Sequence, residues 1–575
     1  IACAKKLLAA PDAIFPQFAT HNAQTLASIH ALAGPNFTTE SYEFQCLHGM
    51  GETLYREVVG PEKLNRPVRV YAPVGTHETL LAYLVRRLLE NGANSSFVNR
   101  IQDPAVSVEE LITDPVTLSA NALPSTLRQP SDLFQPEREN SHGLDLADEN
   151  TLKTLGIALH KEASFGETAG EDVVNPADKS DVIGYIKPTA VESVGAVISK
   201  AVTGFDVWKN TPVSERATCL EKAAQSLEDD MPRLMGLIIR EAGKTLANAV
   251  SEIREAVDFL SYYAAQIRRE FTAENAAPLG PVVCISPWNF PLAIFLGQVS
   301  ASLAAGNSVL AKPAEETPLI AQEAIRILHD AGVPAEALQL VPGGGEIGAA
   351  LVADPRITGV LFTGSTEVAK LIQKQLAGRV NADGTPLPLI AETGGQNALV
   401  VDSSALSEQV VGDVLSSAFD SAGQRCSALR VLCLQNDSAD RVLTMLKGAM
   451  AELRTGNPAL PKTDVGPVIT EEAQSGILSH IEDMRARGFS IHQSAISEEC
   501  ANGTFVPPTL IEIDSLSALR REVFGPVLHV VRYRREERSQ LMAAINNTGY
   551  ALTFGVHSRI DSTIEDLKAI SDAGN

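Results

Sequence analysis

Short apolar runs and amphipathic helical segments alternate along the first hundred residues of the chain. Strand-like runs cover 13–20, 41–49 and 66–75, and an amphipathic helical pattern follows at 80–91. Repeated β-loop-α units of this length predict parallel strands covered by helices. Three such units are too few to close a barrel.

The pattern changes twice farther along the chain. Residues 101–148 are rich in Pro, Ser, Asn and Asp without sustained periodicity, which predicts a long irregular connector between domains. Helical patterns follow at 192–210 and 215–245. Helix-like segments then alternate with short apolar runs that each end in Gly or Pro, at 280–287, 307–313, 338–343, 359–364 and 387–395. This rhythm predicts a doubly wound parallel α/β sheet.

Composition and charge narrow the class of protein. The net charge of −23 disfavours a nucleic-acid partner, because phosphate binding needs clustered Lys and Arg. The uncharged stretch 275–311 is interrupted by prolines, so no apolar helix of about 20 residues fits there. Seven scattered cysteines without a CxxC pair predict reduced thiols, no metal site and a cytoplasmic location. Because the chain opens without Met and stops just after a helical pattern, we expect a fragment truncated at both ends.

Two glycine-containing turns are candidate phosphate sites. A G-x-G-x-x-G pattern over 343–348 follows an apolar strand, but Glu346 inside it would lie badly beside a pyrophosphate. Gly364 and Ser365 begin a second helix, whose free N–H groups suit a phosphate. Each turn is also compatible with a tight β-α connection that simply needs Gly. Together they favour a dinucleotide site more than either does alone.

A lone cysteine is usually a small core residue, so Cys426 gains its meaning from motifs elsewhere in the chain. Six motifs occur in one order: PWNFP (287–291), AKPAEETP (311–318), FTGSTE (362–367), AETGGQNA (391–398), GQRCSA (423–428) and EVFGPV (522–527). In this order and spacing the sequence resembles the aldehyde dehydrogenase superfamily, from about residue 160 to the end. The resemblance implies that Cys426 is the catalytic nucleophile.

The same resemblance implies the other catalytic roles. The Asn289 side-chain amide and the Cys426 backbone N–H would stabilise the oxyanion that forms when the thiolate attacks an aldehyde. Glu392 would be the general base that activates the hydrolytic water, with a pKa raised by its apolar and small neighbours. A base there favours hydrolysis to a free acid over transfer to coenzyme A. Ser427 is a candidate ligand of the semialdehyde substrate.

The cofactor implied by the resemblance is NAD. Lys312 and Glu315 would bind the adenosine ribose, and a carboxylate there would repel a 2′-phosphate, which favours NAD over NADP. Glu522 would bind the nicotinamide ribose, and Phe524 would pack beside the ring. The remaining expected contacts come from four residues: Pro287, Trp288, Gly364 and Ser365.

The first hundred residues resemble the end of the proline dehydrogenase barrel, a (βα)₈ flavoenzyme fold. The motifs are FATHNAQT (18–25), YEFQCLHGMGE (42–52), VRVYAPVG (68–75) and YLVRRLLENGANSSFVNR (83–100). The resemblance implies that Arg86 and Arg87 clamp the proline carboxylate, for which a bidentate guanidinium is suited. Glu90 would steady the arginines and Tyr71 would lie near the substrate. The expected FAD neighbours are Thr20, His21, Asn22 and Gln45.

The order of the two parts resembles the family of bifunctional proline-catabolic enzymes called proline utilization A. This implies NAD-dependent oxidation of L-glutamate 5-semialdehyde, formed from Δ1-pyrroline-5-carboxylate, to L-glutamate. An intact relative would also oxidise proline with FAD, assemble as a homo-oligomer and contact the membrane periphery. We expect the present chain to hold FAD poorly. The alternatives are an aldehyde dehydrogenase of other specificity and an inactive fragment or scaffold.

The expected fold class is α/β, with the C-terminal part of a (βα)₈ barrel followed by an aldehyde dehydrogenase fold. Residues 1–100 would form the last strands and helices of the barrel, and 101–150 the linker. Residues 151–392 would form the Rossmann-like NAD-binding domain, with a hairpin or oligomerisation flap inserted near 260–280. Residues 393–575 would form the catalytic thiol domain, incomplete at its C-terminus.

Overall fold

The computed structural model describes residues 1–575 except 94–95, 121–126, 160–164, 272–275 and 382–383. The chain divides into two compact units, Ile1–Arg128 (unit 1) and Gln129–Asn575 (unit 2). Among the described residues, no helix combines the length and the apolar character needed to cross a bilayer.

Unit 1 contains an open parallel sheet with the strand order β1-β2-β3. Its elements are α1 (Ala2–Leu8), β1 (Gln17–Ala19), α2 (Ala23–Ala33), β2 (Glu43–Leu47), α3 (Glu52–Tyr55), β3 (Val68–Tyr71), α4 (His77–Gly92), α5 (Phe97–Arg100), α6 (Val108–Leu111) and α7 (Pro115–Ala120). The fully buried Tyr42 and Phe44 pack with Leu26 and Ile29 of α2 in a small core. The three strands expected from the sequence are present.

Helix α4 leaves much of its apolar face exposed. Leu81, Leu88 and Leu89 keep 61%, 63% and 69% of their surface accessible. Three short strands offer too little area to cover a helix of 16 residues.

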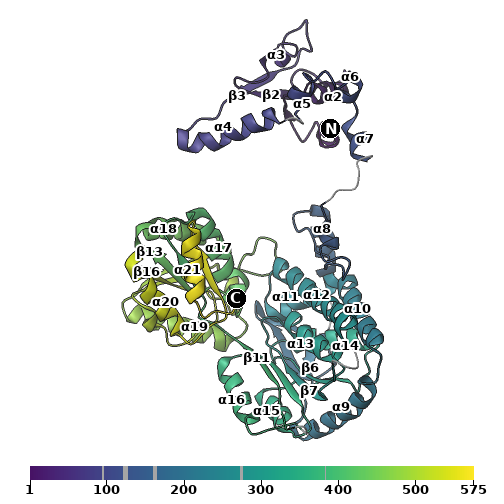
Figure 1. Ribbon diagram of the computed structural model, residues 1–575, viewed down its shortest axis with the longest axis vertical. Coiled ribbons are helices and arrows are strands. Elements are labelled where there is room, and N and C mark those ends of the chain that lie inside the picture. The colour runs from purple at the N-terminus through teal and green to yellow at the C-terminus, as the bar shows by residue number, and fades with distance from the viewer. Residues whose placement is uncertain (94–95, 121–126, 160–164, 272–275, 382–383) are drawn as a thin grey trace. The chain divides into compact units, whose positions relative to one another are not determined.

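The first lobe of unit 2 is built on a parallel sheet with the order β11-β10-β7-β8-β9 and helices on both faces (Figure 1). Its strands are β7 (Pro281–Ile285), β8 (Ser308–Lys312), β9 (Leu338–Leu340), β10 (Gly359–Gly364) and β11 (Leu389–Thr393). Its helices are α8 (Glu149–Leu159), α9 (Val194–Trp208), α10 (Val213–Asp229), α11 (Met231–Ala242), α12 (Leu246–Glu270), α13 (Ala293–Ala304), α14 (Pro318–Asp330), α15 (Gly345–Ala353) and α16 (Thr366–Leu376).

Alternation along the strands explains why this sheet needs two helical layers. Val282 and Cys284 of β7 join one core cluster with α10 to α14, whereas Val283 joins another with α9, α15 and α16. A strand buried on both faces reads as a continuous apolar run, which is the pattern the sequence shows. The doubly wound sheet expected from the sequence is confirmed.

A small separate sheet holds the hairpin of this lobe. It has the order β4-β6-β5, with β4 (Phe165–Gly166), β5 (Glu171–Asn175) and β6 (Asp178–Ile186), and β5 and β6 are antiparallel. The expectation of a hairpin near 260–280 is wrong for the described residues, because α12 continues through Glu270. The apolar positions of α12 recur at helical spacing up to Ile267, which extends the helix. Residues 272–275 lie outside the described residues.

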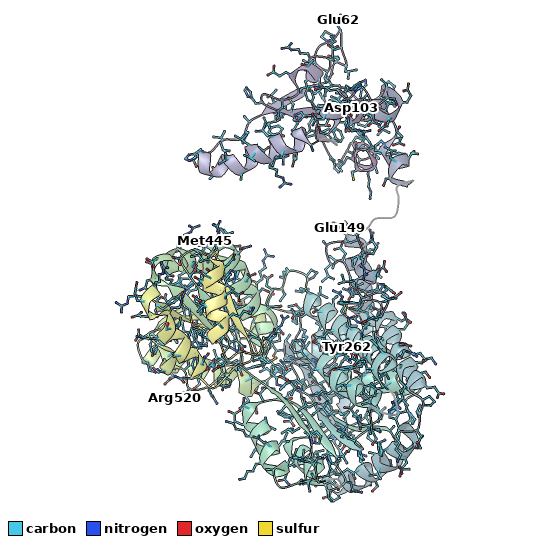
Figure 2. All side chains as sticks on the ribbon, viewed as in Figure 1. Glu62, Asp103, Glu149, Tyr262, Met445 and Arg520 are labelled. Atoms are coloured by element: carbon cyan, nitrogen blue, oxygen red, sulfur yellow. The ribbon has the colours of Figure 1, made fainter. Side chains whose placement is uncertain are left out.

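The second lobe of unit 2 contains a sheet with the order β14-β15-β16-β13-β12-β17, parallel except for β14. Its strands are β12 (Ala398–Val401), β13 (Val431–Gln435), β14 (Ser490–Gln493), β15 (Thr509–Ile513), β16 (Val527–Tyr533) and β17 (Phe554–His557). Its helices are α17 (Ser407–Phe419), α18 (Asn436–Glu452), α19 (Glu471–Ala486), α20 (Arg538–Asn546) and α21 (Asp561–Ile570). Met445 of α18 marks this lobe in Figure 2, and Tyr262 of α12 marks the first.

The segment that opens unit 2 is irregular but held in place. Apart from the short 3₁₀ turn Pro130–Asp132, residues 129–148 contain no helix or strand, and hydrogen bonds join them to α10 and α12. Arg138 and Ser141 both bind Asp258 of α12, with distances of 2.6 Å and 2.7 Å to its carboxylate oxygens. The boundary between the two units, at Arg128, falls within the connector expected at 101–150.

Candidate active site

Cys426 lies in a tightly constrained loop between α17 and β13. Three consecutive residues before it, Ser421, Ala422 and Gly423, have φ angles of 55°, 53° and 65°. The left-handed region is costly for residues with a Cβ, and such strain persists only where the surroundings hold the backbone. A Cβ on Gly423 would lie 2.2 Å from the carbonyl oxygen of Gly525, so the loop needs glycine at this point.

Hydrogen bonds fix the loop on both sides of the thiol. The side-chain nitrogen of Asn397 donates to the carbonyls of Cys426 and Ala428, at 2.7 Å and 2.9 Å. The oxygen of the Gln424 side chain accepts from the N–H of Ile469 at 2.9 Å. The Cys426 side chain itself is half-buried, and burial raises the pKa of its thiol. The backbone N–H of Ser427 opposes this effect on the pKa most strongly and Arg430 more weakly, whereas the Glu522 carboxylate adds to it.

Asn289 approaches this loop from the other lobe. Its side-chain nitrogen donates to the carbonyl of Gln424 at 3.1 Å, and the residue is 7% exposed. An amide group has a second N–H, which remains as a donor for an oxyanion at Cys426. The structure therefore brings the predicted nucleophile and the predicted oxyanion donor into one place.

Glu252 and Lys244 hold the loop that carries Asn289, between β7 and α13. The sequence motifs include neither residue. Glu252 of α12 accepts from the backbone N–H groups of Leu292 and Ala293, at 3.0 Å and 2.8 Å. Its second oxygen pairs with Lys244 at 2.8 Å, and both side chains are almost fully buried. The sequence contained one sign of this role: Glu252 lies on the apolar face of an amphipathic helix. A charge buried there without a partner would strongly destabilise the fold, so a partner was to be expected.

A cleft of about 570 Å³ runs from Cys426 along both lobes. Eight of the predicted site residues line it: Pro287, Trp288, Asn289, Gly364, Ser365, Cys426, Glu522 and Phe524. Trp288 and Phe524 meet edge to face, with ring centroids 5.6 Å apart. The Ser365 hydroxyl caps α16 by accepting from the N–H of Val368 at 3.2 Å. Residues of α19 form a wall that the sequence did not predict, because only tertiary packing places that helix here.

The residues predicted to bind the adenosine ribose lie in an acidic environment beside the cleft. Lys312 is buried at the end of β8, and burial lowers its pKa while three nearby carboxylates oppose that effect. Those carboxylates belong to Glu315, Glu316 and Glu346, and only Glu316 lines the cleft. A Cβ on Gly344 would meet the Glu346 and Glu315 carboxylates at 2.9 Å and 3.3 Å. A phosphate bound at the 343–348 turn would face both of these negative charges.

Glu392 and Ser427 are not among the residues that line the cleft. Glu392 lies on β11, the edge strand of its sheet, and its side chain is exposed. The apolar surroundings expected for this residue are therefore absent on its own strand, where the preceding Ile390 and Ala391 are exposed as well. The next residues, Thr393 and Gly394, do reach the cleft. Ser427 is exposed beside Cys426.

Unit 1 has a smaller cavity of about 290 Å³. Seven residues predicted from the sequence line it: Thr20, His21, Asn22, Gln45, Tyr71, Arg87 and Glu90. Glu90 accepts from both arginines, at 3.1 Å from Arg86 and 2.9 Å from Arg87, but Arg86 is exposed and does not line the cavity. Helical spacing explains the difference, because adjacent residues point about 100° apart.

Comparisons with known proteins agree with this geometry. The Bifunctional protein PutA of Klebsiella aerogenes is 57% identical over 605 residues, covering 100% of this chain and 46% of that protein. The 1-pyrroline-5-carboxylate dehydrogenase of Geobacillus kaustophilus is 34% identical over 418 residues, covering 70% of this chain and 80% of that protein. A solved variant of proline utilization A from Bradyrhizobium japonicum aligns with a TM-score of 0.81 and 47% identity, covering 100% of this chain and 57% of that one.

The chain spans about half the length of the PutA relatives it matches. The model of the Proline dehydrogenase family matches residues 1–100, and that of the Aldehyde dehydrogenase family matches residues 164–575. The chain therefore belongs to the aldehyde dehydrogenase family, preceded by a proline dehydrogenase segment as in the bifunctional PutA proteins.

Proposed function

We propose that this chain oxidises L-glutamate 5-semialdehyde, the hydrolysed form of Δ1-pyrroline-5-carboxylate, to L-glutamate with NAD. The single observation that carries the proposal is the cleft that joins Cys426 and Asn289 to Glu522 and Phe524. The names of the relatives supply the substrate, since they include 1-pyrroline-5-carboxylate dehydrogenases and bifunctional PutA proteins.

The residues of the cleft fit a dinucleotide. The free N–H groups at the start of α16 suit a phosphate, and the Glu522 carboxylate suits ribose hydroxyls. Trp288 and Phe524 supply an apolar wall. The carboxylates of Glu315 and Glu316 would repel a 2′-phosphate, which supports NAD rather than NADP. NAD bound in this cleft would supply the hydride acceptor.

The chain's own residues account for the other steps. The Cys426 sulfur forms a bond to the aldehyde carbon, while Asn289 and the Cys426 N–H donate to the oxyanion. Once the carbon has lost its hydride, a thioester remains on Cys426. Glu392 takes a proton from water, the water oxygen attacks the thioester carbon, and the thiolate departs as glutamate forms. Because Glu392 is exposed in this structure, it must turn toward the cleft for that step.

The exposed position of Glu392 favours a second candidate function, a chain that binds NAD without turnover. NADH formation separates the two, with Δ1-pyrroline-5-carboxylate and propanal supplied in parallel. We expect the first to be oxidised with a much higher kcat/KM, and the Cys426→Ala variant to form no NADH. NAD binding without NADH formation from either aldehyde would support the second candidate, and equal use of both would indicate a different aldehyde substrate.

Unit 1 supports a narrower proposal. Its cavity of about 290 Å³ lies at the lower end of the range for small-molecule sites, which is roughly 300–1,000 Å³. We infer that this chain holds FAD poorly and does not oxidise proline, whereas the longer bifunctional relatives would do both. Assembly as a homo-oligomer and peripheral membrane contact are proposals for that intact enzyme. All seven cysteines lie within the described residues as free thiols, which supports a reducing, cytoplasmic location.

A further inference from the structure

Arg430 is a buried cation directly before β13. It follows the loop of residues 420–429 that carries Cys426, here called the thiol loop. Its side chain is 1% exposed, and a guanidinium removed from water to this degree is costly unless nearly all its donors are satisfied. It therefore needs an explanation that neither the motif pattern nor the proposed catalytic steps supply.

The guanidinium donates to the backbone of the thiol loop. One terminal nitrogen lies 2.6 Å from the carbonyl oxygen of Gly423, and the other lies 2.9 Å from that of Arg425. These two carbonyls belong to residues just ahead of Cys426. The rigid planar fork of an arginine fixes both at once, which a lysine cannot do.

The same guanidinium binds the cofactor side of the cleft. Its Nε and one terminal nitrogen donate to Glu522 Oε1, at 3.2 Å and 3.0 Å. The guanidinium carbon lies 5.1 Å from the centroid of the Phe524 ring. The other Glu522 oxygen packs against Gly394, where an added Cβ would overlap it. Two motifs that are far apart in the sequence thus meet at the Arg430 side chain, and a third, which contains Gly394, reaches it through Glu522.

We infer that Arg430 is a positioning residue that fixes the Cys426 loop relative to Glu522 and Phe524, the two side chains that would hold the nicotinamide end of NAD. The inference rests on the proposed function for its catalytic meaning. Its geometry predicts two separable consequences. Its charge pairs with the Glu522 carboxylate, which would otherwise disfavour the Cys426 thiolate, and its fork holds Glu522 ready for the cofactor.

Two variants separate these consequences. The pH dependence of Cys426 alkylation by iodoacetamide, followed on the Cys426 peptide by mass spectrometry, reports the thiol. Titration with NAD reports the cofactor site. For Arg430→Met we expect the alkylation midpoint to rise by about half a pH unit or more, and NAD to bind about tenfold more weakly. For Arg430→Lys we expect the midpoint to stay near that of the wild type, while NAD binding still weakens several-fold.

Arg216 provides the matched control. It is equally a buried arginine, 6% exposed, and it donates to the carbonyls of Ala304 and Thr211 without lining the cleft. Arg216→Met should leave both measurements unchanged in the folded protein. The inference is overturned if Arg216→Met reproduces both effects, or if Arg430→Met leaves the alkylation midpoint where it was.

The inference would also be overturned if Arg430→Lys bound NAD as tightly as the wild type. If Arg430→Met does not fold, the NAD titration of Arg430→Lys is the deciding test. Both measurements can be made without turnover. A wild-type chain that forms no NADH would therefore refute the proposed function while the role of Arg430 is still tested.

Discussion

The side-chain nitrogen of Asn289 lies 3.1 Å from the backbone carbonyl oxygen of Gln424 and donates a hydrogen bond to it. These residues are 135 positions apart and belong to different lobes of unit 2. The bond orients the amide so that its second N–H can serve the substrate oxyanion.

Asn289→Ala should lower kcat by about 10²- to 10³-fold, because one preorganised oxyanion donor is lost. NAD affinity should change little, since the amide would donate to the oxygen of the aldehyde and not to the cofactor. Steady-state kinetics and NAD titration check this. A variant with normal kcat would show that Asn289 has only a structural role.

Glu392→Gln should release one NADH per active chain in an initial burst and then turn over slowly. Acyl transfer to Cys426 would still occur, but the thioester would hydrolyse poorly without a base. Stopped-flow absorbance at the NADH band measures the burst. Its disappearance would mean that Glu392 acts before the thioester forms.

Removing either partner of the Lys244–Glu252 pair should destabilise unit 2 by about 3–5 kcal/mol, because the remaining charge would stay buried and unpaired. Lys244→Met and Glu252→Ala serve as the single variants in denaturant unfolding. The double variant should cost less than the sum of the two, as expected for groups in contact. Additive losses would contradict a direct interaction.

Burial lowers the pKa of His529 to about 3, and the nearby His480 acts in the same direction. Between pH 6.5 and about 3 the unfolded chain would bind a proton at this residue that the folded chain does not, so stability falls as the pH falls through this window. One proton corresponds to a slope of about 1.4 kcal/mol per pH unit.

His529→Gln should flatten this acid limb of unfolding free energy against pH, because the glutamine does not titrate. An unchanged slope in His529→Gln would show that the acid sensitivity arises elsewhere.

The purified chain should carry no flavin absorbance, since the small cavity of unit 1 offers few contacts to FAD. Absorbance spectra after gel filtration in the presence of added FAD test this. One flavin per chain would refute the proposal.

Local pattern was enough to predict many of the individual elements and to single out eight of the residues that line the cleft. The continuous apolar run of β7 predicts that the strand is buried on both faces, as it is. The motifs that contain Asn289, Cys426 and Glu522 occur in one order along the chain. The apolar positions of α12 recur at helical spacing up to Ile267, so the sequence also indicated how far this helix extends, although a hairpin was expected there. These features depend on neighbours within a few residues, so the sequence alone could determine them.

Contacts between distant residues were decided only by the tertiary structure. The exposure of Glu392 follows from the place of β11 at the edge of its sheet, which no stretch of sequence reveals. The fork of Arg430 meets Glu522 across 92 residues, and Glu252 reaches the N–H of Leu292 across 40. Their energies come from burial and directional hydrogen bonds, which exist only when chain packing excludes water.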